Sequence, residues 1–212
     1  MRSFRSQALA CAFACALATP ALAAAQGPLP AGIWTNTEDA YFAEEEGRPR
    51  PAPVMIDVGA DGRWRGIDAF GAPQGEWQEG AIPGLAPREG GSGWQIDGSE
   101  IRRARPFTCW VSVRKFAAKP DGATDWTFAG NLTSFDQGGR VTIPGDGVAP
   151  DVSIRLRNVT WAKGSRNKPS LVLYVHKDDP ERAESYSWAS PDASLVGINL
   201  RWMQGSCTRS GD

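Results

Sequence analysis

Short runs of alternating apolar and polar residues, separated by glycine and proline, dominate this chain. There are 24 Gly and 16 Pro among 212 residues, and most of them lie between such runs. A period of two places successive side chains on opposite faces of a β-strand. The sequence therefore predicts an all-β fold: a single-domain antiparallel β-barrel or β-sandwich of roughly ten short strands, with at most one short helix near the mature N-terminus.

Two of the runs have the form of β-hairpins. Residues 54–58 and 63–70 flank a Gly-Ala-Asp-Gly turn, and Asp97-Gly98 interrupts a second run at residues 94–104. Asp-Gly is a preferred two-residue connection between antiparallel strands. Further strands are predicted at residues 107–118, 125–135, 139–144, 151–161, 170–177 and 195–203.

The run at residues 151–161 separates its side chains by face. Ile154 and Leu156 fall on one side, and Arg155 and Arg157 on the other. Charged side chains usually remain in water. This pattern predicts a strand with one core face and one solvated face. The run at residues 170–177 is almost entirely apolar or aromatic and predicts an interior strand.

Residues 1–23 have the pattern of a secretory signal peptide. Arg2 and Arg5 precede an apolar run at residues 8–17, and small residues follow it. The apolar run is too short for a typical membrane-spanning helix. The predicted organisation is therefore a signal peptide followed by one all-β domain at residues 24–212. The predicted location is the periplasm or the extracellular space.

The predicted mature chain is slightly acidic and has two cysteines. Loss of Arg2 and Arg5 lowers the number of basic residues from 23 to 21 against 24 acidic ones, which gives a charge of about −3. Such a balance has no basic footprint for nucleic acid, and no later run is long enough to span a membrane. Cys109 and Cys207 remain after cleavage and are predicted to form a disulfide in an exported protein.

An acidic stretch at residues 37–51 is the one candidate helix. Thr37 is a possible N-cap, and Gly47 suits the position after the helix ends. Arg48 and Arg50 follow and can pair with the glutamates. Exposed clusters of this kind usually form solvated turns with weak ion pairs, and this is the favoured interpretation. The stretch lacks the alternating spacing of a calcium loop, so no metal site is predicted.

The alternative interpretation of this stretch is a glycosidase-type acid and base. The side chains that could serve are Glu38, Asp39, Glu44, Glu45 and Glu46.

Nine tryptophans are the most unusual feature of the composition. Most are expected to pack in the core, but a large flat ring can also stack on a ligand. Trp126 and Trp202 lie among alternating apolar residues and are expected to face the core. The predicted ligand-binding residues lie in a turn-rich region and are Trp64, Trp77, Trp94, Arg63 and Arg65.

Catalytic motifs are scarce. His176 is the only histidine, so a Ser-His-Asp triad would have to use it, and it is expected to be an ordinary residue at a strand end. No phosphate-binding loop and no dinucleotide fingerprint is present, and no cofactor is predicted. The leading hypothesis is a non-catalytic exported β-domain that binds a small molecule, a glycan or an envelope partner. The alternatives are a carbohydrate-active or other acid–base hydrolase, and an envelope structural protein without a ligand.

Overall fold

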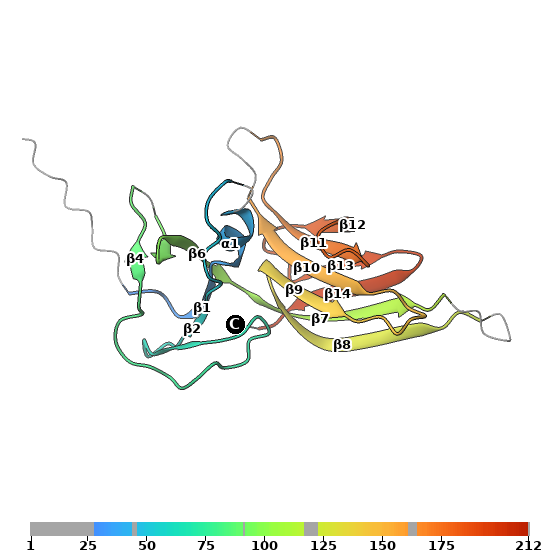
Figure 1. Ribbon diagram of the computed structural model, residues 1–212, viewed down its shortest axis with the longest axis horizontal. Coiled ribbons are helices and arrows are strands. Elements are labelled where there is room, and N and C mark those ends of the chain that lie inside the picture. Colours follow the sequence, from blue (N-terminus) through green and yellow to red (C-terminus); the bar gives the residue numbers. More distant parts are fainter. Residues whose placement is uncertain (1–27, 44–45, 91, 117–122, 161–164, 212) are drawn as a thin grey trace, which may run out of the picture.

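The computed structural model describes residues 28–43, 46–90, 92–116, 123–160 and 165–211 (Figure 1). These residues confirm the predicted class, because they form antiparallel sheets and one short helix. The elements are β1 (Gly32–Thr35), α1 (Thr37–Ala43), β2 (Met55–Val58), β3 (Trp64–Gly66), β4 (Leu85–Pro87), β5 (Trp94–Ile96), β6 (Ser99–Ala104), β7 (Pro106–Arg114), β8 (Trp126–Phe135), β9 (Gln137–Ile143), β10 (Val152–Val159), β11 (Ser170–Lys177), β12 (Ala183–Ala189), β13 (Leu195–Asn199) and β14 (Met203–Arg209).

Six short strands form an N-terminal sheet in the order β3-β2-β1-β6-β5-β4. The first predicted hairpin is present as β2 and β3, although β3 is shorter than expected. The second is present as β5 and β6. The φ angles at Asp97 and Gly98 are 49° and 81°, the left-handed values that a two-residue hairpin turn favours. Ile56 and Ile101 belong to the small core cluster of this sheet.

Two four-stranded sheets, β12-β11-β10-β9 and β13-β14-β7-β8, form a sandwich beside the N-terminal sheet (Figure 1). Their inner faces share one core cluster, to which Leu156 and Leu173 contribute from the first sheet and Val111 and Met203 from the second. The predicted interior strand is β11, which pairs with β10 on one side and β12 on the other.

The predicted disulfide between Cys109 and Cys207 is present, and both residues are buried. Cys109 lies on the inner face of β7 with Val111 and Val113, as expected. The expectation for the chain end was wrong in one respect. The predicted last strand at residues 195–203 is a strand and a turn, and the chain then returns as β14, which carries Cys207. β14 lies between β13 and β7, so the disulfide joins two neighbouring interior strands.

Helix α1 begins at Thr37, so its N-cap lies one residue earlier than predicted. The carbonyl of Asn36 accepts the first helical hydrogen bond from the amide of Ala40 (2.8 Å), so Asn36 occupies the N-cap position expected for Thr37. The helix lies against the sandwich near the end of β10 (Figure 1). It covers part of the outer face of that strand. The prediction of a solvated arginine face was therefore wrong for Arg155, which is buried.

Trp126 was expected in the core but is exposed on β8, because Thr127 and Ala129 face inward instead.

The predicted signal peptide lies outside the described residues, and the division into residues 1–23 and 24–212 stays a prediction. Within the described part of the chain, no helix is long and apolar enough to cross a membrane.

Candidate functional site

A buried ion network joins α1 to the outer face of β10. Arg157 donates through Nε to Glu38 Oε2 (2.8 Å), and its Nη2 lies 2.7 Å from the same oxygen. Arg155 donates through Nη2 to Glu38 Oε1 (3.1 Å). The Glu38 carboxylate is thus shared by two arginines that lie 117 and 119 residues away in the sequence.

Aromatic rings of α1 lie against both guanidinium groups. The Arg155 guanidinium is 3.8 Å from the centroid of Tyr41, and that of Arg157 is 4.6 Å from the centroid of Phe42. A cation over an aromatic face is attracted by the ring quadrupole. Burial lowers the pKa of Arg155, and the nearby Glu38 carboxylate opposes this effect. The network therefore holds α1 on the sheet, and Glu38 is engaged by two cations.

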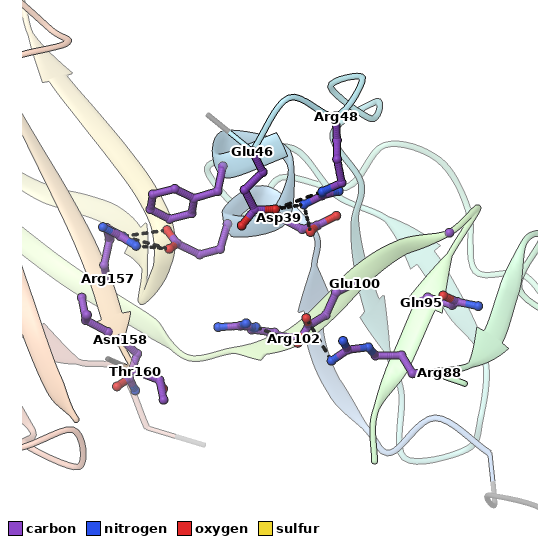
Figure 2. Close-up of a pocket in the computed structure, with 14 residues that line it drawn as sticks. Asp39, Glu46, Arg48, Arg88, Gln95, Glu100, Arg102, Arg157, Asn158 and Thr160 are labelled. Atoms are coloured by element: carbon purple, nitrogen blue, oxygen red, sulfur yellow. Dashed lines mark hydrogen bonds and ion pairs between the residues drawn. The ribbon is translucent and has the colours of Figure 1, made fainter. Parts of the chain in front are cut away.

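A charged cleft of about 550 Å³ opens between α1, the β5–β6 hairpin and the end of β10 (Figure 2). On its α1 side, Arg48 lies 2.8 Å from Asp39 Oδ1 and 2.7 Å from Glu46 Oε2. Ser99 donates to the other oxygen of Asp39 (2.8 Å). The predicted pairing of Arg48 with this acidic stretch is confirmed.

These contacts bear on the acid–base hypothesis. Burial would raise the pKa of Asp39, but hydrogen bonds from Arg48 and Ser99 outweigh it, so the pKa lies below the ordinary value. Asp39 is therefore ionised at neutral pH and unsuited to donate a proton. Glu38 is occupied by the buried arginines. Glu44 and Glu45 lie outside the described residues.

On the opposite side of the cleft, two arginines share a single acid. Arg88 Nη1 lies 3.0 Å from Glu100 Oε2, and Arg102 Nε donates to Glu100 Oε1 at 3.0 Å. Figure 2 shows the three side chains below the Arg48 group, with Arg102 directed toward the middle of the cleft. This side of the cleft therefore has one guanidinium charge in excess of its carboxylate.

A second cavity, of about 630 Å³, lies on the outer face of β11 and β12. Three rings line it, and we call them the aromatic platform: Tyr174 on β11, and Tyr186 and Trp188 on β12. Tyr174 and Tyr186 are paired residues with ring centroids 6.2 Å apart, and Tyr186 and Trp188 are 5.4 Å apart. Successive rings are tilted by 49° and 31°, so the three rings do not share one plane.

The surroundings of the platform are polar at one end and apolar underneath. Asn167, Lys168 and Ser170 line the same cavity, and Val172 forms a buried floor beside the rings. Arg157 lies 5.8 Å from the centroid of Tyr174. A concave aromatic surface with a few polar groups at its rim is the usual form of a small-ligand site.

The predicted ligand-binding residues lie elsewhere, on the N-terminal sheet. Trp64 and Trp94 are partly buried against its core cluster. Trp77 is covered by arginines, with the Arg65 guanidinium 4.3 Å and that of Arg63 5.8 Å from its ring centroid. None of the five lines the charged cleft or the cavity of the aromatic platform. Their role in binding stays a prediction.

His176 is buried near the end of β11, on the same outer face as Tyr174. Burial and the charges of Arg140 and Arg155 lower its pKa to about 4, so the ring is neutral at pH 7. The described residues include no group of three or more His, Cys, Asp or Glu side chains that could hold a metal ion.

No protein-family model matches the chain, and no match is found among the curated proteins or the solved structures.

Proposed function

We infer that this protein is a non-catalytic, exported glycan-binding domain, and that the aromatic platform is its binding surface. The observation that carries this proposal is the placement of three aromatic rings on one outer face of the sandwich, along a cavity of about 630 Å³. Tyr186 and Trp188 are exposed to solvent. Large apolar side chains in neighbouring exposed positions commonly mark an interaction site.

A glycan suits this surface for two reasons. A pyranose ring has a face of C–H groups that can pack on the flat, electron-rich face of an aromatic ring, and its hydroxyl groups still need hydrogen-bond partners. Asn167 and Ser170 at the rim offer such partners. The tilt between successive rings favours a single twisted chain over a flat crystalline surface, because tilted rings do not share one plane.

Export and lack of catalysis are part of the same proposal. The disulfide between Cys109 and Cys207 supports an oxidising compartment. The state of Glu38 and Asp39, both engaged by arginines, favours binding over the alternative of an acid–base hydrolase.

The test is titration calorimetry with soluble oligosaccharides of cellulose, xylan, chitin, galacturonan and alginate. Trp188→Ala should weaken binding of the recognised sugar by at least about tenfold, as for a central aromatic anchor, whereas Trp188→Phe should retain most of it. The matched control is Phe128→Ala on the opposite sheet, because Phe128 is 67% exposed and Trp188 is 68% exposed. Failure of every glycan to bind, or equal losses in Trp188→Ala and Phe128→Ala, would overturn the proposal.

A further inference from the structure

The linings of the two cavities are adjacent at the C-terminal end of β10. Arg157 and Val159 line the charged cleft, and Val172 and Ser170 line the cavity of the aromatic platform. In the sheet, Arg157 is paired with Val172, and Val159 with Ser170. Paired residues on neighbouring strands are about 5 Å apart. A ligand several sugar units long can therefore contact both cavities.

The far side of the charged cleft has the chemistry of an anion site. Arg88 and Arg102 both contact Glu100, so two positive charges share one negative charge. Their side chains are 44% and 46% exposed. An arginine has five N–H donors, and each of these contacts uses one donor. Both guanidinium groups keep donors for a carboxylate or a sulfate, which arginine binds in a forked geometry.

The other acids of the cleft lie with other arginines, so this excess positive charge is local to the β5–β6 side. Asp39 and Glu46 share Arg48 on the α1 side. Glu38 is held by Arg155 and Arg157 in the buried network. Figure 2 shows the Arg48 group and the Arg102 group on opposite sides of the cleft. A bound anion would therefore be attracted to the β5–β6 side and repelled from the α1 side.

We propose that the ligand is an acidic polysaccharide. Its sugar rings stack on Tyr186 and Trp188, and an anionic group farther along the chain is bound by Arg88 and Arg102. A bound anion would balance the excess charge of the pair that shares Glu100. This inference rests on the proposed glycan-binding function and adds the chemical class of the glycan.

The test compares polymers that differ only in charge. Calorimetry is done with cellulose oligosaccharides and their C6-oxidised uronic forms, with galacturonan and its methyl ester, and with neutral dextran and dextran sulfate. At least one acidic member should bind about tenfold more tightly than its neutral partner, because charge-assisted hydrogen bonds are gained. The gain should shrink as salt is raised. The first two pairs report on carboxylates and the third on sulfates.

Variants then locate the anion site. Arg88→Gln and Arg102→Gln should each remove most of the preference for the acidic member, measured as the ratio of its affinity to that of the neutral member. The matched control is Arg63→Gln, because Arg63 is 48% exposed and is also held by one acid, Asp61, outside the cleft.

The outcomes separate the inference from the function on which it rests. Equal affinity for acidic and neutral members, or a preference that survives both cleft variants, would overturn the acidic-ligand inference while glycan binding stands. Absence of binding to all members, and also to the glycans that test the proposed function, would overturn that function as well. A preference that Arg63→Gln reduces as much as Arg102→Gln would mean general charge attraction or an anion site at the predicted Arg63 group, and either result would overturn the inference.

Discussion

Replacement of Glu38 by glutamine tests whether the buried ion network holds α1 on the sandwich. The substitution keeps the size of the side chain and removes its charge. Arg155 is 6% exposed and would lose its anionic partner. Removal of one member of a buried ion pair costs about 3–5 kcal/mol, because the remaining charge stays buried. Since glutamine still offers one acceptor oxygen, we expect a loss near the lower limit, about 3 kcal/mol.

The assay is urea unfolding followed by fluorescence, together with a thermal melt. For a chain of this size, about 3 kcal/mol corresponds to a melting temperature lower by about 6–12 °C. The matched control is Glu46→Gln, because Glu46 also pairs with an arginine but is exposed. That change should cost no more than about 1 kcal/mol. A double-mutant cycle with Arg155→Gln should give a coupling energy above about 1 kcal/mol. A Glu38→Gln loss no larger than that of the control, or no coupling, would refute this role of the network.

Three other predictions follow from the same structure. Gly138→Ala should destabilise the fold by about 1–3 kcal/mol in urea unfolding, because Gly138 has φ of 84° and an added Cβ would lie 2.5 Å from Glu38 Oε1. A loss of stability below about 0.5 kcal/mol would contradict the close approach of Glu38 to Gly138. The neutral, buried His176 has a folded pKa of about 4 against an unfolded value of 6.5, so the unfolded chain binds more protons between these values. The contribution of neutral His176 to the free energy of unfolding is therefore fully present above pH 6.5 and is lost as the pH falls toward 4. His176→Gln should make the melting temperature less dependent on pH between pH 6.5 and 4. An unchanged slope of melting temperature against pH would contradict this role of His176. The disulfide between Cys109 and Cys207, separated by 98 residues, should contribute up to about 4.7 kcal/mol. Replacement of both cysteines by alanine should lower stability and speed hydrogen exchange in β13 and β14, and unchanged exchange there would refute its role in fixing those strands.

Local patterns were enough to predict ten of the strands and the turns of two hairpins, but not β1, β4, β12 and β14. Asp97-Gly98 forms the predicted hairpin because both residues adopt the positive φ that this turn requires. Ile154 and Leu156 lie in the core, as their alternation indicated. Cys109 and Cys207 pair because they are opposite each other on neighbouring strands. These features depend on residues close in sequence, or on the pairing of the only two cysteines outside the predicted signal peptide.

The covered arginine face could not be predicted in the same way. Alternation in β10 identified which side chains share a face with Arg155, but it carries no information about what lies above that face. The cover is Glu38 on α1, which is 117 residues away in sequence. The acidic stretch was interpreted locally as a solvated turn. That interpretation suits Glu46, which is exposed, but not Glu38, which is buried.

The aromatic platform has a pattern in the sequence of β12, where small and aromatic residues alternate. The usual arrangement is reversed, because the aromatic residues face outward. In β12, Ser185 and Ser187 are the more buried residues, and Tyr186 and Trp188 between them are exposed. Amphipathic strands commonly place the large apolar residues inside, so this strand was not recognised from its alternation. The inward positions of β12 are taken by small serine side chains, so the aromatic rings lie on the outer face. A strand on a sheet edge with exposed rings is exposed to unwanted pairing with other chains. A bound glycan would cover the exposed rings, which connects the unusual alternation to the proposed function.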